Sequence, residues 1–413
     1  MKRRVVVTGL GVVSSIGIGR DAFWNNLVSG KSGVSPVTRF DTSEYDVTIG
    51  GEVKDFEANR YVSRRESTRL GRAAQFAIAA SKLAVEDANL TIEKLAGSTG
   101  SVCLGTTMAE AQALERLDEE ITETGHCKRI SIRHYARQYP SCMIAAHVAR
   151  YFRIKGPAFM FGTACAAGNY SIAYGTDLIR LGKCEVVLAG GADPFSRTAF
   201  MGFGRLFALA PDKCRPFDRN RKGIIVGEGA GMLLLESLEH AIERGVEPYA
   251  EVLGYGTSCD ASHMTIPDVK GVVAAMRNAL LDAGISASDV DYINAHGTGT
   301  PANDKTECLA IGALFTERDG EIPVSSIKSM LGHTMGAASA IEAIACSLVV
   351  QRDTLPPTIN YETPDEDCPI DCVPNRARRQ RADVVLNNSF AFGGNNACVV
   401  FGKVGATKRG VES

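Results

Sequence analysis

The 413-residue sequence predicts an α/β fold in which a mostly parallel sheet is covered by helices. Short β-branched runs alternate with longer segments of helical period, which is typical of strands joined by helical crossovers. Glycine is frequent, with 42 residues, as expected where strands turn sharply into helices. Hydrophobic residues make up 45% of the chain and charged residues 22%, which indicates a globular protein with a large core.

The expected elements follow one another along the whole chain. Strands are expected at residues 4–8, 101–105, 158–163, 185–189, 231–236, 291–295, 384–386 and 397–401. Helices are expected at residues 72–89, 166–181, 272–283, 304–315 and 337–351. Residues 195–223 have no clear period and are expected to form a long, ordered surface or lid region. A second alternating series starts with a run at 249–256, so we divide the chain into residues 1–245 and 246–413.

Charge and hydropathy exclude several classes of protein. Lys and Arg number 45 against 47 Asp and Glu, and this net charge of -2 gives no general attraction to nucleic acid. No run approaches the roughly 18 apolar residues of a membrane span. The basic start leads into valines that Gly9 and Gly11 interrupt, which favours a buried first strand over a signal peptide. We expect a soluble protein.

The cysteines indicate a reducing compartment. Twelve are scattered singly, and the close pair Cys368 and Cys372 has no second pair with which to bind zinc. The seven histidines show no ligand spacing either, so we expect no metal. A cytoplasmic location fits these cysteines best.

The sharpest local pattern is FMFGTACAAG at residues 159–168, a strand that runs into a helix with Cys165 at the turn. A thiol at a helix N-terminus is exposed to free backbone N–H groups, which favour the thiolate and can hold an oxyanion. We therefore expect a nucleophile whose pKa lies below the roughly 8.5 of a free cysteine. The alternative is a buried structural cysteine.

Two histidines occupy similar junctions. His296 stands in NAHGTGTP at residues 294–301, and His333 stands in SSIKSMLGHTMGAA at residues 325–338, five residues after Lys328. Each could be structural when taken alone. Together with Cys165 they would lie where α/β sheets carry their sites, at the ends of strands.

A fourth pattern, NNSFAFGGNN at residues 387–396, places Phe390 and Phe392 among polar residues and paired glycines. A tight turn with core aromatic rings would explain it. The pattern alone favours that explanation, and the alternative is a glycine-flanked loop that brings a backbone N–H and a mobile ring to the nucleophile.

With these segments the chain resembles the β-ketoacyl-acyl carrier protein synthases of the KAS II type and the ketosynthases of type II polyketide pathways. The resemblance covers nearly the whole chain. It includes VVVTGLGVVSSIG, GTACAAG, RPFDRNRKGIIVGEGAG, NAHGTGTPANDKTE, SIKSMLGHTMGAASAIEAI, PPTIN and NNSFAFGGNNACVVF. It implies the thiolase fold, in which two similar mixed-sheet halves form α-β-α-β-α layers. The N-terminal half would carry the cysteine, and the C-terminal half the two histidines and the gate loop.

The resemblance also implies roles for the residues at the site. Cys165 matches the nucleophile that receives the acyl group, and His296 and His333 match the pair that drives decarboxylation of malonyl-acyl carrier protein. Lys328 matches the active-site lysine. Its expected carboxylate neighbours are Asp304, Glu307 and Glu342.

The remaining expectations concern substrate and partners. Thr298 and Thr300 match the pair that binds the phosphopantetheine arm, Phe392 matches the gate residue with Phe390 beside it, and Met108 would lie near a subunit interface and the end of the acyl pocket. The substrates would arrive on acyl carrier protein, with no permanently bound cofactor. The resemblance implies a dimer, either of identical chains or with a chain-length-factor-like subunit.

The sequence departs from the usual fatty-acid enzyme in three places. Residues 106–111 read TTMAEA where a glycine-rich loop is expected, Ala391 replaces a glycine of the gate loop, and residues 222–223 read Lys-Gly. We therefore expect a specialised pathway, such as that of a polyene or aromatic polyketide, with fatty-acid elongation as the alternative.

Three other classes remain as alternatives. A thiolase would use Cys398 as its second reactive cysteine, but that residue lies in an apolar strand. An initiating KAS III enzyme would lack the second histidine. A catalytically silent partner subunit, like a chain-length factor, would lack Cys165.

Overall fold

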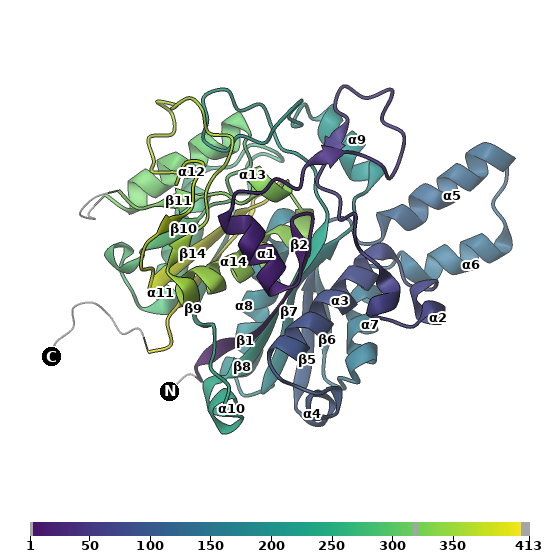
Figure 1. The fold of residues 1–413 in the computed structure, drawn as a ribbon, viewed down its shortest axis with the longest axis horizontal. Coiled ribbons are helices and arrows are strands. Elements are labelled where there is room, and N and C mark those ends of the chain that lie inside the picture. Colours follow the sequence, from purple (N-terminus) through teal and green to yellow (C-terminus); the bar gives the residue numbers. More distant parts are fainter. Residues whose placement is uncertain (1–2, 317–320, 406–413) are drawn as a thin grey trace.

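The structure, a computed structural model, describes residues 3–316 and 321–405. Its centre is an 11-stranded sheet in the order β11-β10-β14-β15-β9-β1-β8-β7-β5-β6, with β2 paired to β1 (Figure 1). The strands are β1 Val5–Ser14, β2 Gly17–Ile18, β3 Ser35–Pro36, β4 Ile49–Gly50, β5 Gly100–Gly105, β6 Ala158–Phe161, β7 Val186–Asp193, β8 Gly229–Ser237, β9 Ala250–Cys259, β10 Tyr292–Asn294, β11 Val324–Ser325, β12 Thr354–Leu355, β13 Arg378–Arg379, β14 Val384–Phe390 and β15 Asn395–Gly402.

The sheet repeats one pairing pattern in two groups of five strands. In the first group β7, β5 and β6 run parallel, and β8 is antiparallel to both β7 and β1. In the second group β14, β10 and β11 run parallel, and β15 is antiparallel to both β14 and β9. A short antiparallel contact of β1 with β9 joins the groups, at Val6 with Glu251 and Val7 with Ala250. The division of the chain at residue 245 stays a prediction.

Helices lie on both faces of each strand group. The α-helices are α1 Arg20–Val28, α2 Arg64–Ser67, α3 Arg72–Asp87, α4 Ile92–Gly97, α5 Ala111–Thr124, α6 Arg129–Gln138, α7 Cys142–Phe152, α8 Ala167–Arg180, α9 Arg197–Arg205, α10 Leu238–Glu243, α11 Val269–Ala283, α12 Pro301–Leu314, α13 Lys328–Leu331 and α14 Ala338–Arg352. Helix α3 covers β1 and β8, α11 covers β9 and β15, and α8 and α14 pack on each other between the two groups. The chain therefore has the layered thiolase fold that its motifs imply.

The contact of α3 with β1 shows how the sequence permits these layers. Every residue of β1 is buried, and a Cβ at Gly9 or Gly11 would lie 2.1 Å from the Ala84 oxygen or 1.8 Å from the Ala80 oxygen. Two glycines facing two alanines thus let the strand and helix backbones approach closely. Buried β-branched side chains around them supply the core.

All the expected strands and helices are present, but the expectation of a mostly parallel sheet is wrong. The pairings of β1 with β8, β7 with β8, β14 with β15 and β15 with β9 are antiparallel. Strands buried on both faces give continuous apolar runs whichever way they pair, so the pattern of residues does not reveal direction.

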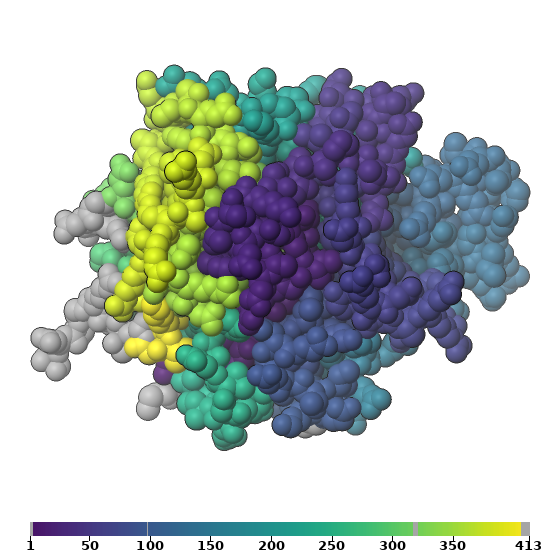
Figure 2. Space-filling model, viewed as in Figure 1, coloured from purple at the N-terminus to yellow at the C-terminus, as the bar shows by residue number. Residues whose placement is uncertain are grey.

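Several segments lie outside the layers, among them the small sheets β3-β4 and β12-β13, the helices α5 and α6, and residues 195–223. Helices α5 and α6 form a hairpin that projects from the body at the side of β5 and β6 (Figures 1 and 2). Residues 195–223 are not uniformly irregular, because they contain α9 and the buried rings of Phe195, Phe200 and Phe217. Within the described residues, no helix is both long and apolar enough to cross a membrane.

Candidate active site

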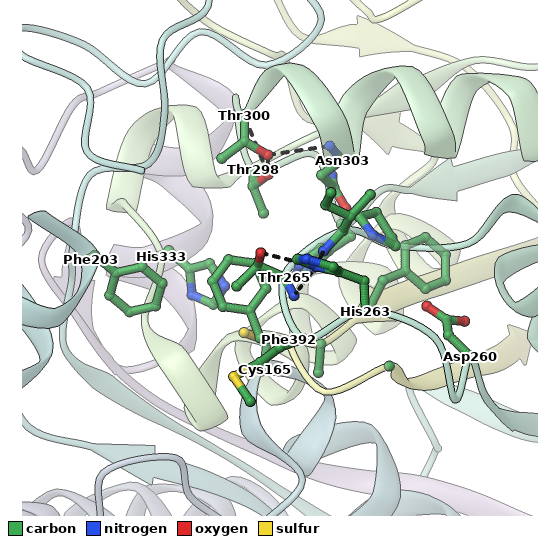
Figure 3. Close-up of a pocket in the computed structure, with 17 residues that line it drawn as sticks. Cys165, Phe203, Asp260, His263, Thr265, Thr298, Thr300, Asn303, His333 and Phe392 are labelled. Atoms are coloured by element: carbon green, nitrogen blue, oxygen red, sulfur yellow. Dashed lines mark hydrogen bonds between the residues drawn. The ribbon is translucent and has the colours of Figure 1, made fainter. Parts of the chain in front are cut away.

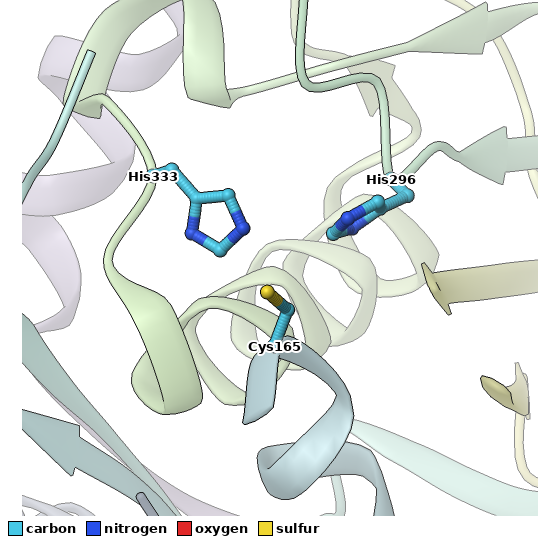
Figure 4. A group of neighbouring side chains, drawn as sticks. All are labelled: Cys165, His296 and His333. Atoms are coloured by element: carbon cyan, nitrogen blue, oxygen red, sulfur yellow. The ribbon is translucent and has the colours of Figure 1, made fainter. Parts of the chain in front are cut away.

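Three reactive side chains from distant parts of the chain converge in the interior. The sulfur of Cys165 and one ring nitrogen each of His296 and His333 lie within 4.8 Å of one another. Figure 4 shows both rings facing the thiol. All three residues are buried, with exposed fractions of 6%, 2% and 2% respectively. The three motifs that suggested a site are therefore brought together.

Cys165 occupies a strained junction between β6 and α8. It lies in a short 3-10 helix, Ala164–Ala166, and Ala164 before it has a φ of 48°, which is unusual for a residue other than glycine. The backbone N–H groups of Cys165 and of Phe392, in the loop after β14, favour the charged form of the sulfur. Two separate segments thus supply polar groups beside the thiol.

The expectation of a low thiol pKa is wrong for the free protein. Burial raises the pKa of Cys165 to about 11, although Lys328 and the N–H groups of Cys165 and Phe392 act to lower it. Desolvation disfavours the charged form, and here it outweighs the helix terminus. Cys165 is therefore a neutral thiol in the free protein at neutral pH.

Two serines that the sequence analysis missed hold the backbone of Cys165. The hydroxyl groups of Ser389 and Ser339 both donate to the Cys165 carbonyl oxygen, at 3.0 and 3.2 Å. Ser339 lies at the start of α14 and Ser389 in β14, so the second strand group fixes a residue of the first.

His296 follows β10 and is fixed through its backbone. The carboxylate of Glu307, on α12, accepts from the N–H groups of His296 and Gly297, at 2.9 and 2.8 Å. Burial lowers the pKa of His296 well below its ordinary value, and Lys328 and His333 lower it further. The ring is therefore neutral, and within the part of the chain described its Nδ1 has no hydrogen-bond partner.

His333 is fixed through its ring. Its Nδ1 accepts from the backbone N–H of Met335 at 3.0 Å, so in the neutral ring the proton is on Nε2. Burial lowers the pKa of His333 well below its ordinary value, with a further contribution from Lys328. The site thus contains a neutral imidazole whose Nε2–H is fixed as its hydrogen-bond donor.

Only one of the three carboxylates expected beside Lys328 is paired with it. Lys328 and Glu342 form an ion pair in which each side chain is 1% exposed. Glu307 instead accepts backbone N–H groups of the His296 loop, and Asp304 accepts those of Phe217 and Gly299. Asp304 and Glu307 therefore organise loops. A pattern of residue types could not reveal that, because backbone donors are present everywhere.

A cavity with about 490 Å³ of empty space, part of it open to solvent, leads to the thiol (Figure 3). Thr298 and Thr300 line it with their hydroxyl oxygens 2.9 Å apart. Phe390 packs edge-on against His296, with 5.9 Å between ring centroids. The ring of Phe392 lies against Phe203, also at 5.9 Å, so these two rings flank the approach.

The structure separates other predicted residues from this cavity. Met108 and Cys398 are absent from its described lining, and Cys398 is fully buried in β15, where burial raises its pKa well above the ordinary value. A role of Cys398 as a second reactive thiol is therefore disfavoured. Both parts of the Met108 expectation, at a subunit interface and at the end of the acyl pocket, stay predictions.

Sequence reasoning also missed part of the lining. Phe203 on α9 and the segment 260–267, including His263 and Met264, border the cavity. The backbone N–H of Gly393 donates to the Met264 oxygen at 2.7 Å, which ties this segment to the gate loop. The only signal in the sequence for this part of the lining was a polar stretch without helical or strand periodicity directly after β9.

One thiol and two imidazoles are also ligand types that zinc takes. The geometry alone therefore allows either metal binding or acyl chemistry. Comparison with known proteins distinguishes between these two kinds of site.

The family models for the β-ketoacyl synthase N-terminal and C-terminal domains match residues 2–241 and 249–362. Together with the fold, these matches define a condensing acyltransferase. The chain belongs to the β-ketoacyl synthase family, and it acts as a β-ketoacyl-acyl carrier protein synthase in fatty acid or type II polyketide biosynthesis.

Two curated proteins are similar to this chain over nearly its whole length. It is 40% identical to 3-oxoacyl-[acyl-carrier-protein] synthase 2 of Synechocystis sp., over 97% of this chain and 98% of that protein. It is 40% identical to nodulation protein E of Rhizobium leguminosarum bv. trifolii, over 98% of this chain and all of that protein.

Two solved structures are also similar over 98% of this chain and 100% of theirs. The ishigamide ketosynthase/chain length factor superposes with a TM-score of 0.94 at 46% identity. A type II PKS ketosynthase, solved in complex with its acyl-carrier protein and bound to the hexaketide, gives 0.89 at 34% identity.

Proposed function

We propose that Cys165 carries the growing acyl chain and that His296 and His333 act on the malonyl unit. The observation that supports these roles is the convergence of one thiol and two neutral imidazoles within 4.8 Å at the end of one cavity. Each role follows from the atoms that each group presents to the cavity.

Acyl transfer requires removal of the thiol proton. Because His296 is neutral and its Nδ1 has no partner among the described residues, its ring can accept a proton from Cys165. The sulfur then bonds to the acyl carbonyl carbon, the carbon–sulfur bond to the carrier arm breaks, and the proton passes to the departing carrier thiolate. The Cys165 thioester and the free carrier thiol are the products.

Decarboxylation follows on the malonyl thioester. The bond to the carboxylate carbon breaks, carbon dioxide leaves, and the electron pair forms an enolate. The Nε2–H of His333 donates to the enolate oxygen, and the His296 ring, neutral once more, donates a second N–H. Neutral donors suit this task because they stabilise the developing charge without giving up their protons.

Condensation completes the cycle. The enolate carbon attacks the Cys165 thioester, and the backbone N–H groups of Cys165 and Phe392, which favour the charged form of the sulfur, hold the tetrahedral oxyanion. Collapse expels the Cys165 thiolate, which takes up a proton, and leaves a 3-oxoacyl chain two carbons longer on the carrier.

The cavity suits substrates carried on a long, thin arm better than it suits a permanently bound cofactor. The hydroxyl groups of Thr298 and Thr300 lie together in the cavity wall, where they can hydrogen-bond the amides of a phosphopantetheine arm. We propose that the acyl and malonyl groups both arrive on this arm of acyl carrier protein, with no permanently bound cofactor. All twelve cysteines are free thiols, which supports a reducing, cytoplasmic location.

We place the pathway among specialised polyketides, such as polyenes or aromatic products. The support is the 46% identity to the ishigamide ketosynthase/chain length factor, against 40% to the 3-oxoacyl-[acyl-carrier-protein] synthase 2 of Synechocystis sp.. Ala391 in the gate loop and the TTMAEA segment at residues 106–111 also depart from the usual fatty-acid pattern.

A second subunit of the same fold would bind at β6. This strand ends the sheet order, so one of its edges has no strand partner among residues 3–316 and 321–405, and the rings of Phe159 and Phe161 pack on Tyr174, which is 36% exposed. We propose either an identical chain or a chain-length-factor-like subunit here. Phe159→Asp should shift the protein to a monomer in light scattering, and an unchanged mass would exclude this surface.

Intact-mass analysis tests the central proposal. The protein is exposed to acyl-carrier thioesters of varied length and unsaturation, beside Cys165→Ala and, as a matched control, Cys142→Ala, which changes an exposed cysteine. An adduct on the unmodified protein and on Cys142→Ala that is absent from Cys165→Ala supports the nucleophile. The donor that reacts best identifies the pathway. No adduct from any donor would favour a catalytically silent partner subunit.

A further inference from the structure

A buried carboxylate that none of these steps uses lies behind the site. Asp193 is the last residue of β7 and is fully buried. Among the residues the structure describes, no Lys or Arg forms an ion pair with it. Burial raises the pKa of Asp193 to about 6, and hydrogen bonds oppose that effect, so near pH 7.5 the group is mainly an anion. A buried anion that no cation neutralises must be stabilised by its hydrogen bonds.

Asp193 joins two separate loops. Its Oδ1 accepts from the Thr106 hydroxyl and the Met108 N–H, at 2.6 and 2.8 Å. Its Oδ2 accepts from the N–H groups of Thr107 and Gly336, at 2.7 and 2.6 Å. The first loop follows β5, and the second is the turn directly after His333.

The hydrogen bond between Gly336 and Asp193 acts on the His333 ring through the neighbouring residue, Met335. The N–H of Met335 donates to His333 Nδ1 and thereby fixes the proton on Nε2. Met335 has a φ of 54°, a conformation that a side chain other than glycine adopts only when its surroundings hold it. Asp193 holds the next residue, so it keeps the Met335 N–H aimed at the ring.

The two loops are also in direct contact. A Cβ on Gly336 would lie 2.6 Å from the backbone of Thr106 and Thr107, and the Thr106 hydroxyl accepts from the Ala109 N–H at 2.8 Å. The loop that begins with Thr106 and the His333 turn therefore cannot move independently while Asp193 binds both.

We propose that Asp193 is a positioning residue for decarboxylation: by holding Gly336 and the Thr106–Met108 backbone together, it keeps the Met335 N–H on His333 Nδ1 and the Nε2–H directed into the cavity. The inference rests on the proposed role of His333. It predicts a defect in the decarboxylation half-reaction and not in acyl transfer, because acyl transfer needs Cys165 and His296.

Asp193→Asn tests this by replacing one acceptor with a donor that faces N–H groups. Decarboxylation of malonyl-acyl carrier protein should lose at least about tenfold in kcat at little change in KM, while the rate of Cys165 acylation stays within about threefold. Glu52→Gln is the matched control, since Glu52 is a buried carboxylate that accepts the N–H groups of Thr38 and Arg39 and does not contact the site. It should leave both rates near those of the unmodified protein.

Thr106→Val covers the case in which Asp193→Asn does not fold. It removes one donor to Oδ1 but leaves the Gly336 bond, so it should slow the same half-reaction by a smaller factor. Equal losses in both half-reactions, or no loss in decarboxylation, would overturn the inference. If the unmodified protein itself neither decarboxylates nor acylates, the proposed function fails instead, so the two failures are distinguishable.

Discussion

The rings of His296 and His333 meet edge to face, with centroids 5.6 Å apart and planes at 86°. The two imidazoles therefore present different edges to the same space beside Cys165. His333 has its Nδ1 bound by Met335, whereas Nδ1 of His296 has no partner in the described residues. This difference supports different proposed roles for the two histidines, as proton acceptor for His296 and as N–H donor for His333. The residue type alone does not distinguish these roles.

His296→Ala and His333→Ala should therefore fail differently. Loss of His296 removes the proton acceptor for the thiol and should slow both Cys165 acylation and decarboxylation. Loss of His333 removes only a donor to the enolate, so acylation should persist while decarboxylation falls by about 100-fold. Rapid-quench mass spectrometry measures the first step and release of carbon dioxide the second. Normal acylation of His296→Ala would contradict the assignment of the base.

The buried thiol should react slowly in the free protein at neutral pH. Because the pKa of Cys165 is about 11, alkylation of its peptide by iodoacetamide should rise about tenfold per pH unit from pH 7 to 10. A plateau below pH 9 would refute the burial argument. The same raised pKa means that the folded form holds this proton more tightly, so stability is lost as pH rises from about 9 towards 11.

Removing one partner of the ion pair between Lys328 and Glu342 should destabilise the protein more than removing both partners. Lys328→Met leaves a buried carboxylate without its cation and should cost about 3–5 kcal/mol in the free energy of unfolding by urea. The double variant with Glu342→Leu should recover most of that loss. Arg60→Met, which breaks an exposed pair with Glu57, should cost less than about 1 kcal/mol. A double variant as unstable as the single one would contradict this account.

Two glycines offer opposite tests of packing. Gly336→Ala should force the Thr106 loop and the His333 turn apart, and lower stability by about 1–3 kcal/mol together with decarboxylation. Gly312→Ala, in α12, meets nothing within 4 Å and should raise stability by about 0.5–1 kcal/mol. Thermal unfolding of both variants checks this, and equal effects would show that the close backbone contact at Gly336 is unimportant.

The sequence was sufficient to locate most strands and the three side chains that converge, but not the helices α5, α6 and α7. Runs of buried valine and leucine mark β1, β7 and β8, and glycine-bounded loops mark Cys165, His296 and His333. The residue pattern did not reveal strand direction, because β8 and β15 are as apolar as parallel strands are, whereas the family resemblance correctly implied mixed sheets.

The electrostatics of the site could be predicted less well from the sequence. A helix N-terminus at Cys165 is visible in the sequence, but the depth of burial that raises its pKa is a property of the packed halves. Asp193, Ser339 and Ser389 bear no signature at all, because their partners lie more than 80 residues away in the chain and, apart from the Thr106 hydroxyl, are backbone groups.

The short contact between β1 and β9 has one further consequence. The thiol belongs to one strand group and both imidazoles to the other, and among the described residues the sheet itself connects the groups through two residue pairs. Most of the joint is therefore a shared apolar core, in which side chains of β1, β7 and β8 pack with those of β9, β14, β15 and α14. Because one core holds the thiol and the imidazoles in register, turnover and the global fold should be lost together on heating.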